Sequence, residues 1–310
     1  MKFAFVFPGQ GSQSVGMMQA FAESKAVRRV FTEASDALEQ DLWKLAAVGP
    51  VEELNATINT QPVMLTAGYA VYRAWREIGG AEPAIVAGHS LGEYTALVAA
   101  GAVAFRDALP LVRFRAQAMQ EAVPMGEGAM AAILGLDDNA VRTACSEAGQ
   151  GQMVEPVNFN APSQVVIAGH KAAVERAVTA AKAKGAKRAV MLPVSAPFHS
   201  SLLKPAAERL AAYLGKVGFS APRIPVVNNV DVAAENDPQR IKDALARQAC
   251  NPVRWVEVVR RIAGMGIAHV AECGPGRVLA GLTQRIEGNL QGYAINDPAS
   301  LTQTLQALQS

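Results

Sequence analysis

The chain has 310 residues, of which 50% are apolar and 18% charged, a composition typical of a globular protein rather than a disordered one. Its 29 basic and 27 acidic residues leave a net charge of +2, which does not indicate a nucleic-acid partner. Three cysteines, Cys145, Cys250 and Cys273, lie far apart without a C-x-x-C pair. We therefore expect reduced thiols, without a disulfide framework or a zinc knuckle.

Neither the start of the chain nor its longest apolar stretch predicts a membrane or export segment. Only five apolar residues, Phe3–Phe7, separate the first lysine from Pro8, too few for the core of a signal peptide. The longest apolar stretch, Tyr94 to Phe105, falls well short of the roughly 20 residues that span a bilayer. We expect a cytoplasmic protein without a membrane partner.

Strand and helix signals alternate along the first part of the chain. The predicted strands are Phe3–Phe7 and Ile85–Ala87, and the predicted helices are Phe21–Leu45, Thr60–Ile78 with Pro62 in its first turn, Gly92–Ala100 and Phe105–Val123. Strands that are apolar throughout are typical of parallel strands buried on both faces. The pattern predicts an α/β core.

The middle of the chain has a different order. The predicted elements are strand Ala129–Leu134, a helix capped by Asp137 and ended by Gly149, strands Val154–Asn160 and Val165–Ala168, helix Lys171–Lys184 and strand Ala189–Leu192. This β-α-β-β-α-β order predicts a ferredoxin-like subdomain over residues 126–196. The core then resumes with strands Val226–Val227 and His269–Cys273 and the helix Asp237–Ala249. We predict an α/β-hydrolase-like catalytic core with a parallel sheet, formed by residues 1–125 and 197–310.

A serine stands between two glycines where a predicted strand meets a predicted helix, in Gly88-His89-Ser90-Leu91-Gly92. This is the pattern of a nucleophile elbow, a tight turn that raises the hydroxyl above a helix N-terminus. The backbone N–H of Leu91 is then expected to point toward an oxyanion. The alternative is a plain turn serine, because Gly-Ser pairs are common in turns.

A serine nucleophile needs a base, and His199 is the best placed of four histidines. It lies in an irregular loop that returns from the subdomain to the core, where a cleft is expected. We expect packing or surface roles for His89, His170 and His269. No acid between Ser90 and His199 lies in a loop typical of a third triad member. We therefore consider a Ser–His pair oriented by an amide or a backbone carbonyl.

A glycine-rich turn, Pro8-Gly9-Gln10-Gly11-Ser12-Gln13, follows the first predicted strand. Its spacing departs from the dinucleotide fingerprint, because Ser14 stands where a glycine is required. A backbone N–H of this turn is better suited to complete an oxyanion hole with Leu91. The alternative is a plain glycine turn.

Together, these stretches resemble one family over essentially the whole chain. The stretches are Phe7–Gln13, Gly88–Glu93, the helix with Arg115, Phe198–Ser200, Gln248-x-x-Asn251-Pro252-Val253-x-Trp255 and Glu272-x-Gly274-Pro275-Gly276, in that order. In this combination the chain resembles the malonyl-CoA:acyl carrier protein transacylases of bacterial type II fatty acid synthesis.

The resemblance implies roles for the reacting groups. Ser90 would carry the malonyl group as an ester, and His199 would be the general base and then the general acid. The backbone N–H groups of Gln10 and Leu91 would form the oxyanion hole. The main-chain carbonyl of Gln248 would accept the Nδ1 proton of His199.

The resemblance also implies substrate-binding residues. Arg115 would hold the malonyl carboxylate, for which a planar guanidinium with two parallel hydrogen bonds is suited. A structural carboxylate partner for Arg115 is the alternative. Gln61 and Asn160 would line the site. Phe198 would favour malonyl by filling the space that an α-methyl group needs.

Malonyl-CoA and acyl carrier protein are the implied partners, with the CoA thioester as substrate and neither cofactor nor metal required. The family implies a monomer. A basic cluster of Lys182, Lys184, Lys187 and Arg188 could attract an acidic carrier protein. The alternative is a solvated helix end.

Three other functions stay open at this point. A Ser–His thioesterase or carboxylesterase shares the elbow and the base, but has no evident use for Arg115. A non-catalytic binding module would not depend on Ser90. An acyltransferase of a polyketide pathway would differ only in the carrier protein that it meets.

Overall fold

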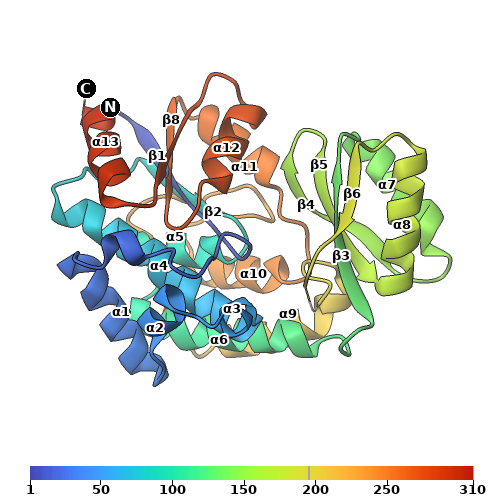
Figure 1. The fold of residues 1–310 in the computed structure, drawn as a ribbon, viewed down its shortest axis with the longest axis horizontal. Coiled ribbons are helices and arrows are strands. Elements are labelled where there is room, and N and C mark those ends of the chain that lie inside the picture. Colours follow the sequence, from blue (N-terminus) through green and yellow to red (C-terminus); the bar gives the residue numbers. More distant parts are fainter. Residues whose placement is uncertain (195, 310) are drawn as a thin grey trace.

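The computed structural model describes residues 1–194 and 196–309, which form a mixed α/β structure with two separate sheets (Figure 1). The larger sheet is parallel and five-stranded, in the order β7-β2-β1-β8-β9. The smaller is antiparallel and four-stranded, in the order β4-β5-β3-β6. Both sheet types and their separation agree with the sequence prediction.

The strands and helices follow one another along the whole described chain. The strands are β1 (Phe3–Phe7), β2 (Ile85–Gly88), β3 (Gly128–Leu134), β4 (Val154–Ala161), β5 (Gln164–His170), β6 (Arg188–Met191), β7 (Val226–Val227), β8 (His269–Cys273) and β9 (Gln291–Ile295). The helices are η1 (Gln19–Phe21), α1 (Lys25–Leu38), α2 (Leu42–Ala47), α3 (Val51–Asn55), α4 (Thr57–Glu77), α5 (Gly92–Ala99), α6 (Phe105–Glu121), α7 (Asp138–Gly149), α8 (Lys171–Ala183), η2 (Ser201–Leu203), α9 (Lys204–Leu214), α10 (Pro238–Gln248), α11 (Trp255–Ala263), α12 (Val278–Ile286) and α13 (Pro298–Gln309).

The central strand β1 is buried along its whole length, because helices cover both faces of the parallel sheet. Its alternate side chains belong to two cores. Phe5 packs edge-on against Trp75 of α4, with ring centroids 5.2 Å apart. Val6, on the opposite face, lies in a second core with Trp255 of α11 and Leu279 of α12. The uninterrupted apolar run of β1 thus follows from its position in the middle layer.

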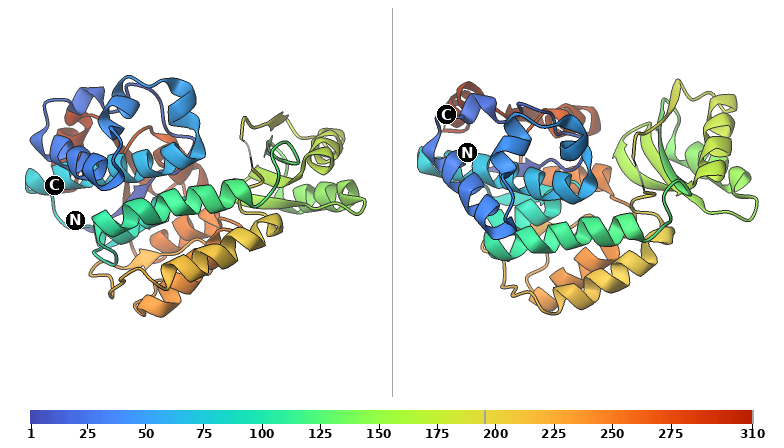
Figure 2. Two further views of the ribbon diagram at one scale, coloured as in Figure 1. Left: turned by 90° about the horizontal axis from the view of Figure 1, so that it is seen from below. Right: turned by 60° about the horizontal axis from the view of Figure 1, so that its bottom comes forward.

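The small sheet has its own core, and one of its edges contacts the segment that precedes α11. Helices α7 and α8 cover its outer face (Figure 1) and supply apolar residues to that core. Its edge strand β4 forms a parallel bridge between Asn158 and Val253, and the Val253 N–H donates to the Val157 carbonyl at 2.8 Å. Figure 2 shows α6 running from the part of the chain around the parallel sheet toward the small sheet, with α9 beside it. Strand β4 is therefore one place where the small sheet contacts the rest of the structure.

Two helix predictions are wrong in detail. The stretch Phe21–Leu45 is divided among η1, α1 and α2, because Glu39 adopts the left-handed conformation at φ +51° and Asp41 caps a new helix. Helix α4 begins before the predicted Thr60–Ile78, so that Pro62 lies inside the helix rather than in its first turn. By contrast, the side chain of Asp137 caps α7 as predicted. No helix in the described ranges combines the length and the apolar character that crossing a bilayer requires.

Glycines allow the turns after β1 and β2 to pack backbone against backbone. A Cβ atom at Gly92 would lie 2.0 Å from the carbonyl oxygen of Phe7, and one at Gly9 would lie 2.5 Å from that of His89. Both distances are far shorter than a van der Waals contact, and backbone atoms cannot turn away as side chains can. The two turns therefore need glycine at these positions.

We expect Gly92→Ala to lower the free energy of unfolding by about 3 kcal/mol, because a methyl group would push β1 and α5 apart. The matched control is Gly281→Ala on the exposed face of α12, where a Cβ meets no atom within 4 Å. That control should stabilise the protein by about 0.5–1 kcal/mol. Urea unfolding of both variants measures the difference. Equal stability of the two would contradict the close packing of the turns.

Candidate active site

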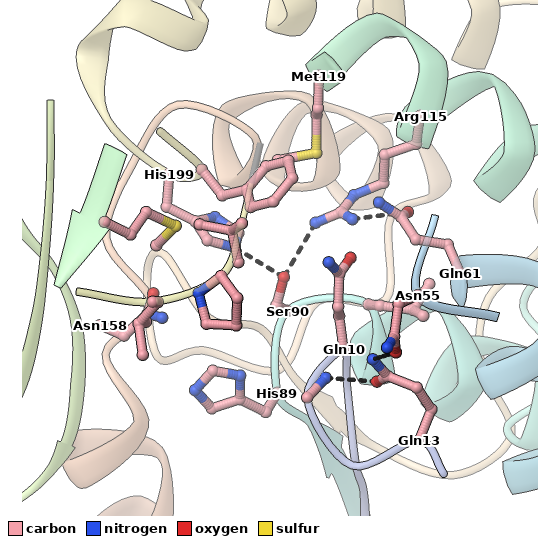
Figure 3. A pocket seen from close by; sticks show the side chains of 17 residues that line it. Gln10, Gln13, Asn55, Gln61, His89, Ser90, Arg115, Met119, Asn158 and His199 are labelled. Atoms are coloured by element: carbon pink, nitrogen blue, oxygen red, sulfur yellow. Dashed lines mark hydrogen bonds between the residues drawn. The ribbon is translucent and has the colours of Figure 1, made fainter. Parts of the chain in front are cut away.

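A pocket of about 450 Å³ opens where β1 and β2 end, and Ser90, Arg115 and His199 line it (Figure 3). The carboxyl ends of parallel strands share one edge of the sheet, and β1 and β2 are neighbours in register. Numbered in chain order, the strands of this sheet run 3-2-1-4-5, so the order reverses beside β1. Ligands of open parallel sheets bind at the strand ends where the order reverses.

Ser90 stands in the predicted turn between β2 and α5 with a strained backbone. Its φ of +53° lies in the left-handed region, which a residue with a side chain rarely adopts. The side chain of Asn229 holds this turn: its Oδ1 accepts from the Ser90 N–H at 2.7 Å, and its Nδ2 donates to the Gly88 carbonyl at 2.8 Å. The strain keeps the hydroxyl in the pocket above the N-terminus of α5.

His199 contacts the serine through one ring nitrogen and a backbone carbonyl through the other. Its Nε2 lies 2.7 Å from Ser90 Oγ, and its Nδ1 lies 2.8 Å from the carbonyl oxygen of Gln248. A carbonyl oxygen can only accept, so Nδ1 carries the proton and Nε2 is free to accept from the hydroxyl. Burial, reinforced by the nearby charge of Arg115, lowers the pKa of His199 to about 3. His199 is therefore a neutral base at physiological pH.

Gln10 and Leu91, whose N–H groups were predicted to bind an oxyanion, both line the pocket. They belong to the two glycine-packed turns, so the packing of Gly9 against the elbow brings them to the same wall. Within residues 1–194 and 196–309, neither backbone N–H donates to a protein acceptor. Two unpaired donors on residues that line the same pocket as Ser90 are what an oxyanion hole requires.

Arg115 of α6 is buried beside the serine, with uncharged hydrogen-bond partners. Its guanidinium donates to Gln61 Oε1 at 2.8 Å, to Gln248 Oε1 at 2.9 Å and to Ser90 Oγ at 3.1 Å. None of the ion pairs in the described part of the chain involves Arg115. A buried cation without a carboxylate on it is costly, so this arrangement favours an anionic ligand.

The other predicted substrate-binding residues occupy different positions. Gln61 and Phe198 line the pocket, Gln61 as a partner of Arg115. Asn160 does not line it: its Oδ1 contacts His89 Nε2 at 2.8 Å, and Asn158 lies at the pocket wall instead. The register of β4 against β5 shifts on both sides of this pair, between Pro156 and Asn158 and between Phe159 and Ala161, so the alternation of a regular strand does not place the two asparagines. His89 also lines the pocket, and burial lowers its pKa.

Three side chains behind the serine were missed by the sequence prediction. They are Asn229, the side-chain amide of Gln248, and Glu93. Asn229 holds the turn at Ser90. Glu93 accepts hydrogen bonds from the Asn229 backbone N–H and from the Gln248 amide. The signal for Asn229 was available, because it follows the predicted strand Val226–Val227 at the same sheet edge. For Glu93 and the Gln248 amide, the side-chain packing had to be known first.

The basic cluster of Lys182, Lys184, Lys187 and Arg188 lies where α8 ends and β6 begins. Lys184 pairs with Glu147 at 2.9 Å. Helix α8 covers the face of the small sheet that is turned away from the parallel sheet (Figure 1). Attraction of a carrier protein by this cluster stays a prediction.

Comparison with known proteins agrees with this geometry. Residues 4–290 match the acyl transferase domain family. A protein of Salmonella typhimurium named malonyl CoA-acyl carrier protein transacylase is 58% identical over 305 residues, which cover 98% of this chain and 99% of that protein. The crystal structure of an acyl-carrier-protein S-malonyltransferase from Burkholderia pseudomallei is 69% identical, with a TM-score of 0.98, and the match covers 99% of this chain and 100% of that one.

A further solved structure holds a malonyl-transacylase in complex with a type II polyketide acyl-carrier protein. It is 54% identical to this chain, with a TM-score of 0.98, and the match covers 99% of this chain and 100% of that one. The family match includes every residue that lines the pocket, and each of these relatives covers 98% or more of the chain. The chain therefore belongs to the acyl transferase family, and within it to the malonyl-CoA:acyl carrier protein transacylases.

Proposed function

We propose that this protein transfers the malonyl group of malonyl-CoA to the phosphopantetheine thiol of an acyl carrier protein, and so supplies fatty acid elongation. One observation carries the proposal: Ser90 Oγ contacts both a neutral histidine base and a buried arginine that has no ion-pair partner in the described chain. The first group activates a nucleophile, and the second fits an acyl group that ends in a carboxylate. The names of the relatives specify malonyl-CoA and acyl carrier protein.

In the first half-reaction, His199 Nε2 takes the proton of Ser90 as its Oγ attacks the thioester carbonyl. The backbone N–H groups of Gln10 and Leu91 stabilise the oxyanion of the tetrahedral intermediate. Arg115 holds the malonyl carboxylate and thereby orients the carbonyl toward the serine. Collapse of the intermediate expels the CoA sulfur, which receives the proton from His199 and leaves a malonyl-serine ester.

In the second half-reaction, the carrier-protein thiol attacks the ester, and His199 now removes the thiol proton. The same intermediate geometry collapses in the other direction and returns the proton to Ser90 Oγ. Two thioesters exchange through one ester, so the chemistry requires neither a metal nor a cofactor. The two substrates use one site in turn, which predicts ping-pong kinetics.

We further propose the finer fold and location assignments. The turn at Ser90 supports an α/β-hydrolase-like core over residues 1–125 and 197–310, and the β-α-β-β-α-β order supports a ferredoxin-like subdomain over residues 126–196. The cytoplasm as location is supported by the free thiols of all three cysteines. Phe198, beside His199 at the pocket wall, supports selection of malonyl over a branched acyl group.

Brief mixing of the protein with malonyl-CoA, without acceptor, should add one malonyl group to its intact mass. Ser90→Ala should abolish this gain, because among the residues that the structure describes only the Ser90 hydroxyl contacts both His199 and Arg115. The matched control, Ser220→Ala in an exposed loop, should acylate like the wild type. Free CoA that accumulates without a mass gain would favour the thioesterase alternative.

We expect Arg115→Ala to slow malonyl transfer by about 100-fold, because the substrate carboxylate loses its buried, charged partner. Transfer of an acetyl group, which has no carboxylate, should fall by less than about tenfold. Arg113→Ala is the control, since that guanidinium lies on the same helix but donates to Leu38 and Gln40. Initial rates with both CoA thioesters test this, and equal losses for the two would refute the carboxylate contact.

The pKa of His199 predicts how acylation depends on pH. The imidazole, with its pKa near 3, stays neutral between pH 8 and pH 5, so kcat/KM for acylation should change by less than about threefold over this range. A histidine with an ordinary pKa of about 6.5 would lose roughly 30-fold by pH 5. Rapid-quench measurements at low malonyl-CoA distinguish the two. An acid limb near pH 6.5 would show that the base is not desolvated.

A further inference from the structure

We propose that Glu93 is a positioning residue for acyl transfer: one of its carboxyl oxygens holds Asn229 and Gln248, and through them the serine and the histidine. This inference rests on the proposed function, since the positions it concerns are those of Ser90 and His199. In the described part of the chain, the side chain of Glu93 makes no hydrogen bond to the reacting hydroxyl or to the base, and its partners are Asn229 and Gln248.

A single atom of Glu93 joins the segment after β7 and the last residue of α10 to the helix that follows Ser90. Glu93 lies in the first turn of α5 and is 2% exposed. Its Oε2 accepts from the backbone N–H of Asn229 at 2.9 Å and from Nε2 of Gln248 at 2.8 Å. Asn229 follows β7, and Gln248 ends α10. Elements that are distant in sequence therefore meet at this oxygen.

Both partners of Glu93 extend to the reacting groups. Asn229 Oδ1 accepts from the Ser90 N–H at 2.7 Å, while Gln248 Nε2 donates to the Ser90 carbonyl at 3.0 Å. The carbonyl of Gln248 accepts from His199 Nδ1 at 2.8 Å. The backbone of Ser90 is thus held at both its N–H and its C=O by residues that Glu93 anchors. A left-handed residue needs such restraint, because its conformation is not the preferred one.

The carboxyl group also decides how the Gln248 amide is turned. Glu93 Oε2 accepts, so Gln248 presents its NH₂ group to Glu93 and its Oε1 to Arg115, 2.9 Å away. The opposite orientation would face an oxygen with an oxygen and an NH₂ group with a guanidinium. Glu93 therefore sets the amide that helps to place Arg115.

The acceptor oxygen, rather than the full negative charge, is what this role requires. Burial raises the pKa of Glu93 to about 7, with Asp231 adding to the shift and Arg115 opposing it. A carboxyl protonated on its other oxygen still presents Oε2 as an acceptor, and a glutamine does the same. Glu93 also lines a small cavity of about 10 Å³ with Asn228 and Glu235.

The experiment compares Glu93→Ala, Glu93→Gln and a matched variant, Glu272→Ala, by single-turnover acylation at saturating malonyl-CoA. Glu272 is also fully buried, and burial likewise raises its pKa to about 7, but it accepts from the Ala280 N–H at the start of α12. We expect Glu93→Ala to lose about 100-fold in the rate constant, as acylation is sensitive to small displacements of the reacting groups. Glu93→Gln and Glu272→Ala should each stay within about threefold of the wild type.

Each outcome decides the proposal at a temperature where all variants are folded by circular dichroism. Acylation by Glu93→Ala at the rate of Glu272→Ala would overturn it, and so would a Glu93→Gln as slow as Glu93→Ala. A wild-type protein that forms no malonyl-enzyme would instead refute the proposed function, and the positioning role with it. The glutamine variant keeps the volume of the side chain, so the test does not depend on the alanine variant alone.

A double-mutant cycle tests whether Glu93 acts through Gln248. Gln248→Ala removes the amide but keeps the backbone carbonyl that orients His199. We expect the acylation rate constant of the double variant to fall by a factor at least about tenfold smaller than the product of the factors for Glu93→Ala and Gln248→Ala. Both substitutions remove the same linkage. Losses that multiply would mean that Glu93 acts independently of Gln248, contrary to the proposal.

Discussion

The left-handed backbone of Ser90 is the constraint on which the rest of the site depends. With φ at +53°, the chain turns sharply from β2 into α5, and the hydroxyl stands in the pocket instead of packing into the sheet. This turn is possible only because glycines precede and follow it: a Cβ at Gly88 would lie 1.9 Å from the backbone of Gly92. Gly9, which also lacks a side chain, lets the turn after β1 approach the backbone of His89. One strained residue therefore determines where the nucleophile and its neighbouring N–H donors lie.

Much of this could be predicted from sequence, because the elbow is local. A short apolar strand, a Gly-x-Ser-x-Gly turn and an apolar helix are adjacent in the chain, and each has a clear pattern. The burial of β1 on both faces and the capping of α7 by Asp137 could likewise be predicted from residues that are adjacent in the chain. His199 could be favoured only from its place in a loop, and the roles of Gln10, Gln248 and Arg115 came from resemblance to a family.

The sequence could not predict contacts that arise between distant elements. Asn229 and Glu93 are 136 positions apart, and their contact requires β7 to lie beside β2 in the sheet. The choice between Asn158 and Asn160 at the pocket involves a strand whose register against β5 shifts on both sides of the pair, which the sequence pattern does not reveal. The break in the predicted Phe21–Leu45 helix arose from a left-handed Glu39, a residue type that carries no signal for that conformation. These features depend on tertiary packing, which overrides local preference.

A backbone carbonyl, not a carboxylate, orients His199 beside Ser90, and the surroundings of that carbonyl give a physical reason. Gln248 serves two groups, with its backbone carbonyl on His199 and its side-chain oxygen on Arg115. A carboxylate in place of that amide would pair with the guanidinium and compete with a substrate carboxylate for it. It would also raise the pKa of the imidazole, since an opposite charge favours the protonated form. An uncharged orienting residue therefore keeps the arginine available for an anionic acyl group and keeps the histidine a neutral base, two requirements that a carboxylate at this position could not meet together.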